Sequence, residues 1–278
     1  MLFRSPKLGF ALLALTATTQ LMSTAKANTI SLGASRDATI YQNTPDNSNG
    51  AGFTMFAGNN GMDSPRRSLL DFDIAGNVPA GSTIDSVQLS LVLQGVAGVD
   101  TTPRTISLHP LLTNWGEGTS GMGLGGGGTG QGFPAKQGDA TWSQNFFGVS
   151  AWTNSGGDFS TTSSASAVVS QSLDSSYTWG STAAMVNDVQ KWLDSPGSNF
   201  GWLLMGDESG TQTFRQFYTR EEANSEFRPE LVINYTAASV PEPSTLTLLS
   251  IAAVCLAGYA RRKERRRKQV SQLVAPGA

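Results

Sequence analysis

The clearest structural signal in this 278-residue chain is the stretch 83–93, which reads TIDSVQLSLVL. Apolar residues recur in it at every second position, namely Val87, Leu89, Leu91 and Leu93. Successive side chains of a β-strand point to opposite faces of a sheet, so these four residues share one face. The stretch therefore predicts a strand with one buried side.

Other strand candidates lie on both sides of this stretch, between clusters of Gly, Asn, Ser and Pro: 38–41, 68–72, 105–109, 201–205, 214–218 and 230–235. Only 183–193, AAMVNDVQKWL, has helical spacing of its apolar residues. Ser181 or Thr182 is placed to cap that helix, and 195–197, SPG, to end it. The pattern predicts an all-β body, a jelly-roll-like β-sandwich with one short helix.

A glycine-rich stretch, 121–132, interrupts this pattern. Its letters GLGGGG at 123–128 satisfy a dinucleotide-binding fingerprint, but no predicted strand precedes them and no predicted helix follows. We therefore interpret the stretch as a surface loop.

The N-terminus has the composition of a secretory signal peptide over residues 1–27. Arg4 and Lys7 precede a short apolar core at 8–15, and Ala25 and Ala27 supply the small residues that a signal peptidase reads. Cleavage after Ala27 would leave a mature body beginning at Asn28. The predicted partners are therefore the secretion machinery and signal peptidase.

The C-terminus consists of three consecutive parts. Val240-Pro241-Glu242-Pro243 is followed by an uncharged run, 244–260, and by a basic block, 261–268, with 269–278 as a final tail. Seventeen helical residues span about 25 Å, which is at the short limit for a bilayer. The run is thus predicted to be a transmembrane helix, and the basic block and the final tail to stay cytoplasmic.

This tail, 239–268, resembles the PEP-CTERM sorting signal of Gram-negative bacteria that make extracellular polysaccharide. The resemblance implies that an exosortase, a membrane protease, recognises the tail and processes it near 240–243. The chain would then be held in the inner membrane before processing and would end at the cell surface or in the extracellular matrix. A plain membrane anchor that is never processed is the alternative.

The body, 28–238, resembles the DNRLRE domain. The motifs are DATIY at 37–41, RSLLDFDI at 67–74, NWGEG at 114–118, ATW at 140–142, NFGWLL at 199–204, FYTRE at 217–221 and RPELVINY at 228–235. The resemblance implies a jelly-roll-like sandwich. It implies a function only loosely, because some relatives look like binding modules for acidic polysaccharides and many others have no known ligand.

The exported part is acidic and contains no cysteine. Between Asn28 and Val240 there are nine Lys and Arg against nineteen Asp and Glu, and the only cysteine, Cys255, follows in the tail. An exported domain without disulfides must rely on its packed core or on bound ions. Its acidity argues against nucleic acid as a partner, since binding a phosphate backbone requires a basic surface.

Acidic residues supply candidates for calcium ligation or for catalysis. Asp71 and Asp73 are two apart in a predicted strand, and Asp207 and Glu208 follow another one. Carboxylate oxygens suit calcium, so calcium is a possible cofactor. A glycosidase needs two carboxylates about 5–10 Å apart. The sequence does not identify such a pair, and we expect no catalytic residues. His109, the single histidine, is interpreted as an ordinary strand residue.

Aromatic and basic residues supply candidates for glycan binding. Trp115 and Trp142 lie in Gly- and Asn-rich stretches and are candidate stacking platforms for sugars, while Arg66 and Arg67 are candidate partners for sugar carboxylates. We therefore expect an exported, non-catalytic surface or matrix protein associated with exopolysaccharide. A polysaccharide-degrading enzyme and a purely structural protein without a ligand remain the alternatives.

Overall fold

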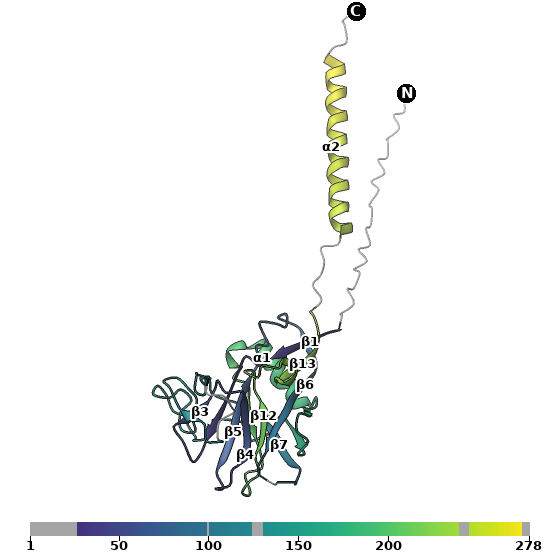
Figure 1. Cartoon of the computed structure of the whole chain (residues 1–278). Helices are drawn as coiled ribbons and strands as arrows, with labels where there is room; N and C mark the ends of the chain where they lie inside the picture. Colours follow the sequence, from purple (N-terminus) through teal and green to yellow (C-terminus); the bar gives the residue numbers. More distant parts are fainter. Residues whose placement is uncertain (1–26, 99, 124–129, 239–244, 274–278) are drawn as a thin grey trace, which may run out of the picture. The chain divides into compact units, whose positions relative to one another are not determined.

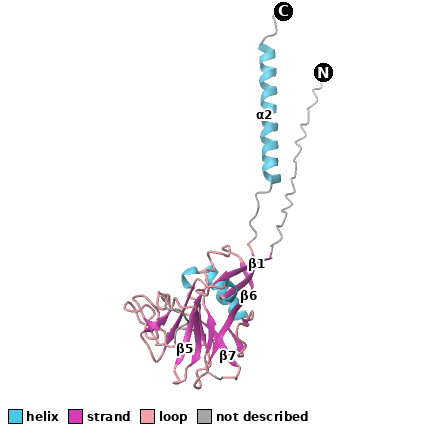
Figure 2. Cartoon of the chain, viewed as in Figure 1, coloured by secondary structure: helices cyan, strands magenta, loops and turns pink. Residues whose placement is uncertain are grey.

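The computed structural model describes residues 27–98, 100–123, 130–238 and 245–273. The body runs in it from Ala27 to Ala238 as one compact unit, and a C-terminal helix belongs to a separate unit. Each unit is therefore treated by itself. Among the described residues, the regular secondary structure of the body is mainly strand, joined by many loops (Figure 2).

Thirteen strands make up the body's sheet: β1 (Ala27–Gly33), β2 (Arg36–Tyr41), β3 (Asn47–Asn49), β4 (Thr54–Asn59), β5 (Pro65–Asp71), β6 (Thr83–Val96), β7 (Arg104–Pro110), β8 (Phe133–Pro134), β9 (Ala165–Val169), β10 (Ser176–Trp179), β11 (Trp202–Met205), β12 (Arg215–Tyr218) and β13 (Glu230–Thr236). They follow the order β1-β13-β6-β12-β4-β5-β11-β7-β9, with β10 beside β6 and with β2, β3 and β8 branching from β5. Figure 1 labels β1, β4, β5, β6, β12 and β13 among them. Every strand pair is antiparallel.

The longest strand, β6, has the one-sided burial that its sequence predicts. Val87, Leu89 and Leu91 are fully buried, whereas Gln88 between them is exposed. Ile84 is also buried although it is three positions from Val87 and so out of phase. A register shift between Asn234 and Tyr235 of β13 explains this. The shift inserts one extra residue into β6, and such a bulge resets which side chains face the core.

Two groups of buried apolar side chains hold the body together. The larger cluster draws on β1, β4, β5, β6, β7, β9, β10, β11, β12, β13 and the helix α1, and includes Trp179, Trp202 and Phe217. The smaller one lies under the loops that follow β7, and includes Trp115, Trp142 and Trp152. Because these loops contribute many buried apolar side chains, they form part of the packed structure.

The predicted helix is confirmed. Helix α1 covers Ala183–Asp194, Thr182 accepts a hydrogen bond from the backbone N–H of Met185, and Ser195 is the residue at its C-terminal cap. Its buried residues are Met185, Val189, Trp192 and Leu193, the four that set its period. A short 3-10 turn, Pro196–Ser198, follows it, and a second one covers Ser225–Phe227 between β12 and β13.

The predicted strands are confirmed as elements, but the finer fold prediction is not. The hydrogen-bonded order is that of a large open antiparallel sheet, and it does not establish the connectivity of a jelly roll. The sequence pattern also missed the short strands β3, β8 and β10, as well as β1, β4 and β9. Short strands in Gly- and Ser-rich stretches have too few residues to show an alternation.

The prediction of a transmembrane helix at 244–260 needs correction. Helix α2 (Thr245–Leu273) continues from the uncharged run through the whole basic block. Among the described residues, no helix combines the length and the apolar character needed to cross a bilayer. The physical reason is that Arg261 follows a run of only seventeen residues that contains several Ser and Thr, whereas a span requires about 20 mainly apolar residues.

We predict that Leu89→Ala lowers the free energy of unfolding by about 2–5 kcal/mol, because it opens a cavity where β6 packs against the larger cluster. Gln88→Ala, on the exposed side of the same strand, is the matched control and should change it by less than about 0.5 kcal/mol. Urea denaturation of both variants measures the two values. Equal effects would contradict the one-sided burial of β6.

Candidate ligand-binding pocket and the predicted site residues

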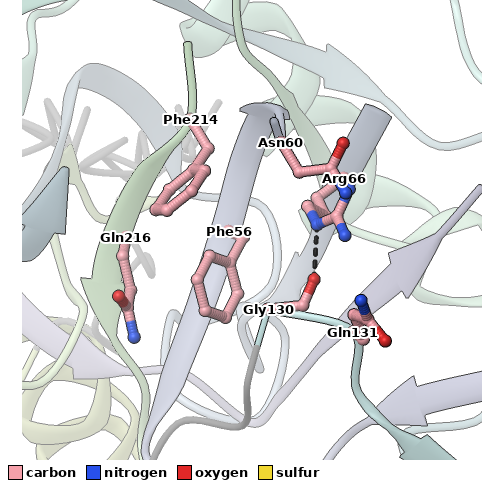
Figure 3. A pocket seen from close by; sticks show the side chains of 7 residues that line it. All are labelled: Phe56, Asn60, Arg66, Gly130, Gln131, Phe214 and Gln216. Atoms are coloured by element: carbon pink, nitrogen blue, oxygen red, sulfur yellow. Dashed lines mark hydrogen bonds between the residues drawn. The ribbon is translucent and has the colours of Figure 1, made fainter. Parts of the chain in front are cut away.

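An open pocket of about 230 Å³ lies across three neighbouring strands, β12, β4 and β5. Its lining is Phe56, Asn60, Arg66, Gly130, Gln131, Phe214 and Gln216 (Figure 3). Gln216 and Phe56 are direct partners in the β12–β4 ladder, and Arg66 lies opposite Gly58 in the β4–β5 ladder. The sheet itself therefore fixes the spacing of these three side chains.

Aromatic rings form one side of this pocket. The rings of Phe56 and Phe214 lie edge to face, with centroids 5.4 Å apart. Gln216 beside them is half-buried and donates to Thr54 Oγ1 at 2.9 Å, which orients its amide. Apolar rings next to fixed amides match the two chemical faces of a sugar, whose C–H groups pack on rings and whose hydroxyls bind amides.

Arg66 forms the opposite side (Figure 3). It is 1% exposed. Its Nε donates to the carbonyl oxygen of Gly130 at 2.5 Å, its Nη1 to that of Ser64 at 2.6 Å, and its Nη2 to Asn43 Oδ1 at 3.2 Å. Within the described residues these acceptors are all neutral, and none of the ion pairs includes Arg66. The pocket thus contains a positive charge that no described carboxylate neutralises.

Burial changes the acid–base equilibrium of this arginine. Removal from water disfavours the charged guanidinium and lowers the pKa of Arg66 to about 10. The face of Tyr41 lies 5.7 Å from the guanidinium carbon and stabilises the cation. Arg66 therefore stays charged at neutral pH, and an anion that entered the pocket would improve its environment.

Arg67, the other arginine predicted to bind glycans, is committed to the body itself. Its Nε and Nη2 each donate at 2.7 Å to the carboxylate of Glu208, and its Nη1 donates to Gly156 O at 2.9 Å. The guanidinium also lies over the ring of Trp142, 4.9 Å from its centroid. Arg67 thus fastens a loop to the sheet and does not line the pocket.

The tryptophans predicted to be exposed platforms are buried, which corrects that prediction. Trp115 is 0% exposed and Trp142 is 8% exposed. The indole N–H of Trp115 donates to Phe200 O at 2.9 Å, and Arg36 lies over its ring. Both rings are occupied by neighbouring side chains, because these loops fold back onto the sheet and need apolar anchors.

The four acidic residues proposed as calcium ligands have other partners. Asp71 binds Arg36 at 2.7 Å, and Asp207 binds Arg104 at 2.6 Å. Glu208 is the partner of Arg67, as described above. Asp73 follows the end of β5 and accepts a hydrogen bond from the backbone of Gly76, so it does not share a strand face with Asp71. Among the described residues, no group of three or more His, Cys, Asp or Glu could hold a metal ion.

The single histidine belongs to a small hydrogen-bonded group on β7. His109 Nδ1 lies 2.8 Å from the carbonyl oxygen of Ser160, and its Nε2 lies 2.9 Å from Ser107 Oγ. Since a carbonyl only accepts, Nδ1 donates to Ser160 O, and Ser107 Oγ lies within hydrogen-bond distance of both Nε2 and Met205 O. Neither residue lines the pocket, so this group does not define a reaction site there.

Comparison with known proteins gives information on the C-terminal tail. Residues 239–267 match the PEP-CTERM protein-sorting motif. This confirms the sorting signal predicted for the tail and, with it, an exosortase as a partner. A tail of this class directs a protein to export and to sorting at a membrane. No curated protein matches the chain significantly. The resemblance of the body to the DNRLRE domain stays a prediction.

The predicted processing sites lie mostly outside the described residues. Residues 1–26, which include Ala25 of the predicted signal peptide, are not described. The same applies to Val240, Pro241, Glu242 and Pro243. Ala27, the residue before the predicted cleavage, is the first of β1, where it pairs with Thr236, the last residue of β13. The first described residue of the body therefore pairs with the last residue of β13.

Sequence reasoning identified Arg66 but missed the other pocket residues. Phe56 lies in a strand that shows no alternation, and Gln131 lies near the end of the glycine-rich stretch. Phe214 and Gln216 fall in a strand that was predicted, two positions apart, and so share a face. The sequence could therefore have indicated that Phe214 and Gln216 act together. Only the structure shows that β12 pairs with β4 and so brings them next to Phe56.

We predict that Trp115→Ala lowers the free energy of unfolding by about 3–5 kcal/mol, because the ring is fully buried under Arg36. Leu112→Ala, an exposed residue of the same loop region, should have an effect below about 0.5 kcal/mol. Thermal denaturation followed by tryptophan fluorescence measures both. A Trp115→Ala variant as stable as the unmodified chain would show that the ring is not an anchor.

Proposed function

We propose that this protein is an exported, exosortase-sorted surface protein whose body binds polysaccharide without cleaving it. The sorting half rests on the match of residues 239–267 to the PEP-CTERM motif. The binding half rests on the pocket across β12, β4 and β5, and above all on the unneutralised charge of Arg66 within it. After sorting, the body lies at the cell surface or in the extracellular matrix.

The chemistry of the pocket favours a sugar that carries a carboxylate. Arg66 offers a buried cation, and charge-assisted hydrogen bonds are about twice as strong as neutral ones. Because the exported part has a net charge of about −10, an acidic polymer would be repelled at most of its surface. The cation of Arg66, inside a pocket of amides and rings, would attract such a polymer at this one place. The proposed partner is accordingly an acidic exopolysaccharide.

The lining also favours binding over catalysis. No residue that lines the pocket in the described part of the chain carries a carboxylate. Glycoside hydrolysis by the usual route requires two carboxylates beside the scissile bond. The acids predicted as candidates are instead paired with arginines or bound to the backbone at other places in the body, as described above. We therefore propose that the protein is not an enzyme.

We predict that Gln131→Glu weakens binding of a soluble polyuronate by about 2–5-fold, and that Gln131→Lys strengthens it similarly, because this exposed side chain lines the pocket. Gln137→Glu and Gln137→Lys, in the same exposed region, are the matched controls. Isothermal titration measures all four variants. Equal affinities throughout, or no heat with either a polyuronate or a neutral glucan, would contradict the pocket and favour a purely structural role.

We predict that Glu242→Ala, within the Pro-Glu-Pro break, stops C-terminal processing, because the tail is expected to be processed near this break and the break lies within the matched motif. Glu264→Ala, in the basic block, removes a carboxylate from the same tail and should leave processing intact. Intact-mass measurement of the protein from cells gives the C-terminus of each variant. An unshortened C-terminus in the unmodified protein would instead support the plain anchor.

A further inference from the structure

A buried carboxylate on β2 has an oxygen without a partner. Asp37 is 0% exposed. Its Oδ2 accepts a hydrogen bond from the backbone N–H of Arg220 at 2.9 Å, but its Oδ1 has no hydrogen-bond partner. An unpartnered charged oxygen away from water is costly, so such a group in a native fold needs an explanation.

A second orphan oxygen belongs to the residue after Arg220. Glu221 Oε1 lies 3.0 Å from Arg220 Nε, while Glu221 Oε2 is buried without a partner. Of all charged groups, Glu221 acts most strongly on Asp37. Each of the two carboxylates therefore has one oxygen occupied by Arg220 and one oxygen unoccupied.

The charges around this pair do not balance. Glu117 completes the group, since it accepts from the backbone N–H of Asp37 at 2.9 Å and binds Arg220 Nε at 2.7 Å. The neighbouring Arg36 does not compensate, because it binds Asp71. Three carboxylates thus surround the one guanidinium of Arg220, so the cluster carries an excess of two negative charges if all of them ionise.

We propose that Asp37 and Glu221 share one proton, so that the body contains a proton-binding site that fastens the segment between β12 and β13 onto β2. A hydrogen on Asp37 Oδ1 or on Glu221 Oε2 turns one of the two carboxylates into a neutral acid and so removes one excess charge. The inference goes beyond the proposed function and does not depend on it.

The electrostatic environment supports this assignment. Burial, followed by the charge of Glu221, raises the pKa of Asp37 well above its ordinary value. Burial also raises the pKa of Glu221, although Arg220 opposes the effect. When two carboxylates share a site, the proton belongs to the pair and one of the two ionises only at a raised pH.

The fastened segment matters because it precedes β13. Thr219 donates through its hydroxyl to Gly52 O at 2.8 Å, and Arg220 and Glu221 follow at once. These contacts set where the chain leaves β12 and turns towards Glu230, the first residue of β13. Losing the proton would place two buried negative charges at this turn and would loosen it.

The sign of the pH effect follows from the raised pKa values. Unfolded Asp and Glu ionise near 3.8 and 4.5, so folding must take up a proton above that range. The stability contributed by the pair is therefore complete at acid pH and is lost as the pH rises through the folded pKa of the pair.

The test compares the full chain with Glu221→Gln and with Asp37→Asn, in thermal unfolding from about pH 4 to about pH 8. In either variant the amide mimics the protonated acid, since it is neutral and its oxygen keeps the contact with Arg220. We expect equal Tm values at the acid end. At the alkaline end the Tm of each variant should be higher by about 2–4 °C.

Glu226→Gln is the control, because Glu226 is exposed on the same segment. Its Tm should follow that of the unmodified chain at every pH. A Tm difference for Glu221→Gln or Asp37→Asn that does not change with pH, or that grows towards acid, would overturn the proposal. Stoichiometric calcium binding that either substitution abolishes would also overturn it, because a metal ion would then occupy the site in place of the proton.

Discussion

The hydrogen bonding of β6 on both of its edges is the interaction on which the rest of the body depends. Residues 83–90 pair with β13, residues 93–96 continue on the same edge with β12, and residues 89–92 pair with β10 on the opposite edge. One fourteen-residue strand thus joins two shorter ones end to end. Both the pocket, through β12, and the chain ends, through β13, take their positions from it.

A body without disulfides must still hold its long loops, and arginine does this here. Partly or fully buried arginines on the strands donate to loop carbonyls: Arg36 to Trp115, Arg66 to Gly130, Arg67 to Gly156 and Arg215 to Thr102. Three of these four also pair with a carboxylate. Arg66 is the exception, and it is the one at the pocket. Three of these arginines thus hold a loop while a carboxylate balances their charge. Arg66 also holds a loop, but no described carboxylate balances its charge.

The sequence predicted those parts of the fold that are determined by residues close together in the chain. The strand at β6, the helix α1 with its Thr182 cap, and the sorting tail each have a period or an ordered motif within a few residues. The burial of Trp115 and Trp142 was predicted wrongly, because Gly-rich surroundings indicate a loop but not whether that loop folds back. The partners of Asp37 lie about 80 and 180 residues away along the chain, and no local pattern reports such separations.

The register pair Ala27–Thr236 has a mechanical consequence. A load applied to the C-terminal end of the body enters it at the end of β13. Seven register pairs join β13 to β1 and seven more join it to β6. A pull along a strand strains its cross-strand bonds together, whereas a pull across the strand would open them one at a time. With a partner strand on each edge, β13 is therefore well placed to resist a load directed along it.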